Sequence, residues 1–264
     1  RSWGAQNIEK VRCVVGSTLF MTLIGGTIIA ILGVIFAKSI LLALGTDPQV
    51  MHLSLPYVQW MLAGSPLLFV YIIYTSILRG VGDSITPLIA LGMTSLIGLF
   101  ITPVLIAGYF GFPRLGIIAP AIATIIGYLA VLIFLAVYLN KKNHPLRPDW
   151  QLLKNIRHQP ILSKIILRLG IPTGIQMVTT SVAGLVIVGL VNRYGAEATA
   201  AYGAVNQVLN YIQFPALSIA IAASIFGAQA IGAGKSDLLA KVTRTALGMN
   251  VIFTGSLITL AYLF

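Results

Sequence analysis

The sequence predicts an all-α membrane protein, a polytopic bundle of seven transmembrane helices. Of its 264 residues, 58% are hydrophobic and only 9% are charged, and the mean hydropathy is +0.95. Soluble domains carry about 25% charged residues, so this composition favours the lipid bilayer as the environment. The apolar residues gather in seven runs, each about the length that a membrane-spanning helix needs: 13–37, 53–78, 86–110, 115–139, 165–192, 198–231 and 246–264.

Each run is apolar on all sides, which favours helices over the alternating strands of a membrane barrel. The first four runs follow one another with short polar gaps, and the last three begin after the one long polar segment. The sixth run is the longest and carries Pro215 near its middle, where a proline removes a backbone hydrogen bond and favours a kink. Small residues such as those in "TSVAGLVIVGL" (180–190) allow close approach between helices.

The basic residues alternate between the two ends of the runs. One set of gaps holds Arg1, Lys10, Arg12, Arg79, Lys141, Lys142, Arg147, Lys154, Arg157, Lys164, Arg168, Lys235, Lys241 and Arg244. The other set holds only Lys38, Arg114 and Arg193. Because cytoplasmic loops are enriched in Lys and Arg, the first set is predicted to be cytoplasmic. The net charge of +11 therefore indicates membrane topology, and we expect no nucleic-acid partner.

The long polar segment 140–164 divides the chain. It contains three prolines and a short amphipathic pattern around Leu152, Leu153 and Ile156, which predicts a helix on the membrane surface. We therefore expect residues 1–139 to belong to one lobe, residues 140–164 to form a cytoplasmic linker, and residues 165–264 to begin a second lobe.

A short basic phrase occurs twice, as "WGAQNIEKVR" (3–12) and as "IGAGKSDLLAKVTR" (231–244). Six predicted spans separate the copies, so both lie on the same membrane face. This indicates an internal six-helix repeat about an axis along the membrane normal, although two common turn sequences could also coincide. Each copy reads as a helix end, a glycine turn and a new helix, with Glu9 or Asp237 in its first turn.

Four segments, in order, resemble the MATE (multidrug and toxin extrusion) family of transporters. They are "LRGVGDSITPL" (78–88), "PRLGIIAPAIAT" (113–124), "YGAEATAAYGAVNQV" (194–208) and "FGAQAIGAGKSDLLAKVTR" (226–244). The resemblance covers the whole chain. It implies twelve helices in two six-helix lobes, of which this chain would hold the third to the ninth. It also implies a central cavity and drug export coupled to Na⁺ or H⁺.

The motif residues are predicted to form structural or gating loops. Gly80 and Gly82 allow a turn, Asp83 or Ser84 can cap the following helix, and Pro87 suits its first turn. The candidates for these loops are Arg79, Gly80, Gly82, Asp83, Gly232, Gly234 and Lys235.

None of the six acids lies centrally in a predicted span, although intramembrane acids are the usual coupling groups. Thr180 and Thr102 stand where some relatives carry a glutamate and an aspartate. We therefore expect no resident cofactor or metal, and we assign no Na⁺ or H⁺ ligand within this chain. The histidines show no metal-binding spacing and Cys13 is the single cysteine, so no metal site is predicted.

Uncharged polar residues form three faces within the spans. These faces either hydrogen-bond to neighbouring helices or line a substrate cavity. The candidates are Gln176, Thr179 and Thr180 on one face, Asn206, Asn210 and Gln213 on a second, and Ser95 and Thr102 on a third. The Asn206 face is the preferred cavity lining because Pro215 follows it.

The predicted function is alternating-access export of amphipathic, often cationic, organic compounds, driven by Na⁺ or H⁺ antiport. A lipid-linked oligosaccharide flippase is the alternative, but its cavity would need basic residues that these spans largely lack. A second alternative is that the chain is a membrane fragment without transport activity. No H-E-x-x-H or G-x-S-x-G motif indicates an enzyme. The expected partners are lipid and small organic substrates, the expected location is the plasma (inner) membrane, and the expected state is a monomer.

Overall fold

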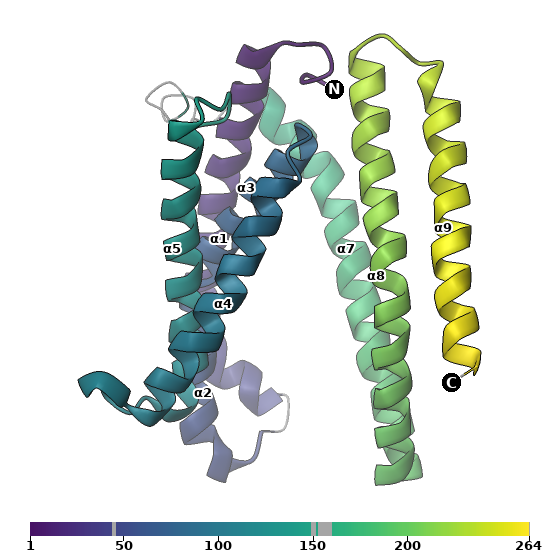
Figure 1. Ribbon diagram of the computed structural model, residues 1–264. Coiled ribbons are helices and arrows are strands. Elements are labelled where there is room, and N and C mark those ends of the chain that lie inside the picture. Colours follow the sequence, from purple (N-terminus) through teal and green to yellow (C-terminus); the bar gives the residue numbers. More distant parts are fainter. Residues whose placement is uncertain (44–45, 149–151, 153–159, 264) are drawn as a thin grey trace. The chain divides into compact units, whose positions relative to one another are not determined.

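The computed structural model describes residues 1–43, 46–148, 152 and 160–263, and these residues are almost entirely helical (Figure 1). The main helices are α1 (Ile8–Ala43), α2 (Pro48–Ala63), α3 (Ser65–Gly80), α4 (Ile85–Ala107), α5 (Ala119–Lys141), α7 (Pro160–Val191), α8 (Ala196–Gly232) and α9 (Leu238–Leu263). Three short 3₁₀ helices are η1 (Tyr109–Gly111), η2 (Gly116–Ile118) and η3 (Asn192–Tyr194). The predicted all-α class is confirmed.

Six of these helices are long and apolar enough to cross a membrane, and the bent pair α2–α3 makes a seventh candidate. Large hydrophobic side chains on them are widely exposed at the protein surface. In water such a surface would be unfavourable, whereas in a bilayer it faces acyl chains. The chain is therefore an integral membrane protein.

The chain divides into two compact units. One comprises Glu9–Ser163, and the other comprises Arg1–Ile8 together with Lys164–Phe264. The assignment of lobes and linker stays a prediction. Of the predicted surface helix, only Leu152 lies within the described residues, and its side chain is buried.

α5 supplies the core of the unit Glu9–Ser163. Most of its buried residues recur every four positions, including Ala123, Gly127, Val131, Leu135 and Leu139. Residues at this spacing share one helix face. α5 packs against α4, which Ala123 and Gly127 of this face contact, and α5 also contacts α2 and α3. The small residues in the first half of the stripe permit close packing between helices.

The second predicted span, 53–78, is not one helix. It is broken into α2 and α3, which meet at Gly64 with a bend of 44°. Pro66 lies in the first turn of α3, where it lacks the N–H that a continuous helix would use. Gly64 lies against α5, because a Cβ built there would be 2.5 Å from Cγ1 of Ile125. The break thus results from a proline and a close contact between helices.

α8 is continuous over 37 residues, although Pro215 lies within it. Pro215 therefore does not interrupt the helix, and the kink stays a prediction. α8 packs against α9, and η3 connects α7 to the start of α8 (Figure 1).

Substitution of Gly64 tests the helix break. Gly64→Ala should reduce the free energy of unfolding by about 1–3 kcal/mol, because the new methyl group overlaps Ile125 in packed surroundings. The backbone of Gly64 has φ −77°, so alanine adds no conformational strain. Gly92→Ala in α4 is the control, since nothing lies within 4 Å of a Cβ there. Thermal unfolding in detergent measures both, and equal transition temperatures would contradict the packing explanation.

Candidate functional site

Four chain segments end in the same hydrogen-bonded turn, the Schellman motif. In each, one N–H bonds to a carbonyl five residues earlier and the preceding N–H to a carbonyl three residues earlier. The residues with positive φ in these turns are Gln6 (55°), Gly82 (94°), Asn143 (49°) and Gly234 (71°). All four turns fall in gaps that the sequence assigns to the cytoplasmic side. They satisfy carbonyls that would otherwise be left unpaired at a helix end.

The first and fourth turns include the starts of the two copies of the repeated phrase. In the first, the N–H groups of Ala5, Gln6 and Asn7 bond to the carbonyls of Arg1, Trp3 and Ser2. In the fourth, Ala233, Gly234 and Lys235 bond to Gln229, Ile231 and Ala230 at the same relative positions. The prediction that the two phrases form equivalent turns is therefore confirmed.

Acidic residues lie where helices begin. Glu9 and Glu197 are in the first turns of α1 and α8, and Asp47 caps α2 through a 2.7 Å bond from the Gln49 N–H. Asp237 directly precedes α9, one residue short of its predicted place in the first turn. The positive end of the helix dipole favours carboxylates at these positions. The remaining acid, Asp149, lies outside the described residues.

Asp83 is the capping residue of α4, a role the sequence left open between Asp83 and Ser84. Its carboxylate accepts bonds from the Thr86 N–H (3.0 Å) and the Thr86 hydroxyl (2.6 Å). Partial burial by itself would raise the pKa of Asp83. The two bonds from Thr86, together with the nearby positive charges of His144 and Lys142, outweigh burial and lower the pKa below its ordinary 3.8.

Within the unit Glu9–Ser163, the segment 142–148 is bonded to α1 and α3 by contacts that the sequence did not reveal. The buried hydroxyl of Tyr74 donates to the Leu146 carbonyl at 2.6 Å, and Nε of Arg12 donates to the Pro145 carbonyl at 2.9 Å. Nδ1 of His144 accepts from the Leu146 N–H at 3.2 Å, and burial lowers the pKa of His144. Main-chain carbonyl partners leave no sequence pattern, so these anchors could not be predicted.

A groove of about 330 Å³ lies between α3 and α4 in the same unit. It is lined by Tyr71 and Thr75 from α3 and by Pro87 and Leu88 from α4, with the exposed Arg79 at the end of α3. Arg79 donates to the Ser76 hydroxyl at 3.1 Å. Arg79 and Asp83 flank the second Schellman turn, and the structural or gating role of this loop stays a prediction.

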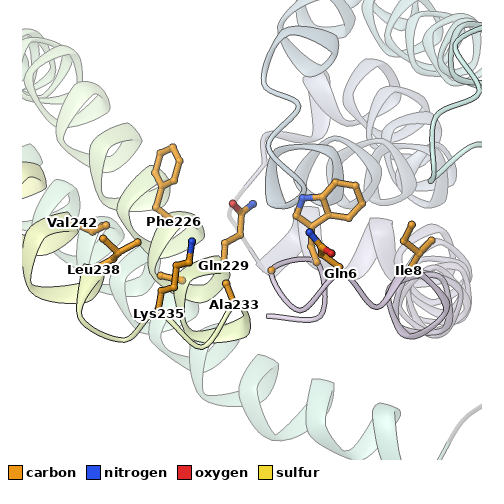
Figure 2. Close-up of a pocket in the computed structure, with 11 residues that line it drawn as sticks. Gln6, Ile8, Phe226, Gln229, Ala233, Lys235, Leu238 and Val242 are labelled. Carbon is orange, nitrogen blue, oxygen red and sulfur yellow. The ribbon is translucent and has the colours of Figure 1, made fainter.

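A larger cavity of about 640 Å³ lies in the other unit, beside the repeated phrase. Figure 2 shows Phe226, Gln229 and Lys235 on one side and Gln6 and Ile8 on the other. The lining combines apolar walls, two side-chain amides and one lysine. Its residues come from the N-terminal turn, the end of α8 and the start of α9.

Comparison with known proteins agrees with this architecture. The MatE family model matches residues 1–104 and 172–264. The chain belongs to the MatE family.

Relatives of this MatE-family chain include the "Probable multidrug resistance protein YoeA" of Bacillus subtilis, which is 43% identical over all 264 residues. A NorM protein of Thermotoga maritima, also named a probable multidrug resistance protein, is 26% identical over 99% of the chain. An outward-facing MATE transporter structure superposes with a TM-score of 0.86 at 22% identity, over 99% of this chain and 57% of that one. The chain spans about half the length of the curated relatives it matches, 57% and 55% for these two.

Within this MatE-family chain, the predicted cavity residues lie on three separate helices. Gln176, Thr179 and Thr180 are exposed on α7, Asn206, Asn210 and Gln213 lie on α8, and Ser95 and Thr102 lie on α4. The hydroxyls of Thr179 and Thr180 donate to carbonyls of their own helix, and Nδ2 of Asn206 donates to the Tyr202 carbonyl. These bonds need no neighbouring helix, so the role of the three faces stays a prediction.

Removal of the α4 cap tests the role of Asp83. Asp83→Ala should lower the free energy of unfolding by about 1 kcal/mol at neutral pH, because the Thr86 N–H loses its acceptor. The pKa of Asp83 is lowered in the folded protein, so this stabilisation is present above 3.8 and is lost as the pH falls through the lowered pKa.

Ser84→Ala is the control, since Ser84 precedes α4 without a side-chain capping bond. Unfolding temperatures of both variants, measured from neutral to acidic pH, test the assignment. A loss at Ser84 as large as that at Asp83, or a difference that persists at the most acidic pH, would refute it.

Proposed function

We propose that this MatE-family chain is part of a secondary-active exporter of amphipathic and cationic organic compounds. The observation that carries the proposal is the 43% identity along the whole chain to a protein named for multidrug resistance. The helical fold and the polar faces on α4, α7 and α8 are compatible with a substrate route through a membrane-embedded bundle. The transporter is proposed to act as a monomer in the plasma membrane.

Transport is proposed to proceed by alternating access, with antiport of Na⁺ or H⁺ as the energy source. Asn206, Asn210 and Gln213 on α8 are proposed to line the substrate route with side-chain amides. An uncharged lining suits substrates that differ in structure, because it binds them through apolar and hydrogen-bonding contacts.

The coupling carboxylate is proposed to lie in sequence outside this chain. The described acids sit at helix starts, where capping and the helix dipole account for them. Metal clusters of three or more His, Cys, Asp or Glu are also absent from the described part of the chain. The proposed sites in this chain bind substrate, and the driving ion is proposed to bind outside it.

Reconstitution tests the coupled export directly. The protein, with its natural flanking sequence, is placed in vesicles with an imposed Na⁺ or H⁺ gradient and a fluorescent organic cation. We expect uptake against the substrate gradient that stops when the matching ionophore collapses the ion gradient. Movement that is the same with and without either gradient would rule out coupling.

Substitution of the α8 amides tests the substrate route. Asn206→Ala and Asn210→Ala should each reduce kcat/KM for export about tenfold, the effect of losing about 1.4 kcal/mol of binding to the transported state. Ser218→Ala is the control, since Ser218 is exposed on the same helix and its hydroxyl donates to the Phe214 carbonyl. Unchanged export in both asparagine variants at equal expression would exclude this face.

A further inference from the structure

The first and fourth Schellman turns, residues 1–7 and 229–235, touch one another, and each does so through its glycine at Gly4 or Gly232. A Cβ at Gly4 would overlap the Gln229 carbonyl oxygen and lie 2.9 Å from the Gln229 Cα. A Cβ at Gly232 would overlap the Arg1 carbonyl oxygen and lie 2.9 Å from the Arg1 Cα. Each glycine therefore has its Cα hydrogen directed at a main-chain carbonyl of the other turn. Residues 1–7 and 229–235, which belong to the same compact unit, are called the turn pair below.

The contact is reciprocal. Gly4 and Gly232 hold the same position in their Schellman turns, and so do Arg1 and Gln229. Each contacted carbonyl also accepts the N–H bond of its own turn, from Ala5 at 3.0 Å or from Ala233 at 2.9 Å. An interface in which the same two positions contact each other in both directions has two-fold symmetry. The turn pair is a local pseudo-two-fold interface between two copies of one motif.

The turn itself does not require glycine at this position. Gly4 and Gly232 have no positive φ, unlike Gly234 two residues later. The same position holds Lys141 in the turn that ends α5, and that turn forms the same hydrogen bonds. Gly80 occupies it at the end of α3, where nothing lies within 4 Å of a Cβ. The close approach of the two turns is therefore what excludes a side chain at Gly4 and Gly232.

We infer that the turn pair is a reversible contact, closed in this structure, and that Gly4 and Gly232 are the positioning residues that allow it to close. This inference rests on the proposed function, because alternating access requires the repeats to separate on one membrane face in one state. The chain runs from the first turn directly into α1, most of which belongs to the other unit. Opening and closing of the turn pair would thus act on the start of α1.

The contact suits reversible closure because it is small and made of main-chain atoms. It joins glycine Cα groups to carbonyls that already have hydrogen-bond partners, so separation leaves no buried polar group unpaired. A bulky apolar interface would hold more strongly, and a salt bridge would depend on ionic strength. The exposed Lys235 and Gln6 lie beside the contact and line the cavity in Figure 2.

Cysteine labelling tests the inference without requiring transport. Cys13 and any cysteine in flanking sequence are replaced by serine, and Ala230→Cys is introduced, because Ala230 is only 6% exposed beside the contact. In inside-out vesicles with a maleimide, we expect slow labelling of this protein. Gly4→Ala or Gly232→Ala should each speed labelling about tenfold, since either methyl group prevents closure. The double variant should label little faster than either single variant, because both substitutions disrupt the same contact.

Gly80→Ala is the matched control, at the same turn position but with open space, and it should leave labelling unchanged. Unchanged labelling in both Gly4→Ala and Gly232→Ala, or equal acceleration by Gly80→Ala, would overturn the inference. Where one variant fails to fold, the reciprocal one replaces it, since the contact predicts the same result for both. If the glycine variants label faster but the protein transports nothing, the reversible turn pair is supported and the proposed function is refuted. If the protein shows coupled export but labelling is unchanged in the glycine variants, the proposed function is supported and the turn pair is refuted.

Discussion

Unpaired backbone groups are costly in lipid, and this constraint organises the whole chain. Inside a bilayer each N–H and C=O must bond within its own helix, which accounts for long uninterrupted helices such as the 37 residues of α8. The constraint leaves the helix ends to be satisfied separately. Carboxylates such as Asp47 and Asp83 accept N–H groups where helices begin, and Schellman turns satisfy carbonyls where they end. The charged and polar chemistry is therefore concentrated at the membrane surfaces.

Glycine serves two different purposes at those ends. Gly82 and Gly234 provide the positive φ of a Schellman turn, a need that Asn143 and Gln6 meet elsewhere. Gly4 and Gly232 instead allow another segment of main chain to come close. Gly64 follows the second pattern against a side chain of α5. In the sequence, Gly64 lies within a predicted span and the other four lie in polar gaps. Only the surrounding atoms distinguish the two purposes.

The sequence predicted what depends on local composition. The seven apolar runs, the acids at helix ends and the equivalence of the two phrases follow from hydropathy and spacing. The family resemblance at 78–88 and 226–244 agrees with the match to the MatE model. The break at Gly64 was missed, because the span 53–78 is apolar on both sides of it and the opposing Ile125 is distant in sequence.

Side-chain hydrogen bonds to main-chain carbonyls also could not be predicted from the sequence. Tyr74 and Arg12 hold the segment after α5 through carbonyls of Leu146 and Pro145, and a carbonyl is present at every residue. The candidate substrate faces show a different limit. Their residues lie on α4, α7 and α8, and whether each face meets another helix or a substrate stays a prediction, because that depends on the helices packed around it.

Sidedness of the two phrases is the most direct test of the duplicated membrane topology. Ala5→Cys and Ala233→Cys occupy exposed, equivalent positions, and Phe112→Cys lies in the exposed connection between α4 and α5. A membrane-impermeant maleimide is applied to intact cells and to inside-out vesicles, with one cysteine in each protein. The account predicts that Ala5→Cys and Ala233→Cys react only in inside-out vesicles and Phe112→Cys only in intact cells. Reaction of Ala5→Cys and Ala233→Cys from opposite sides would contradict it.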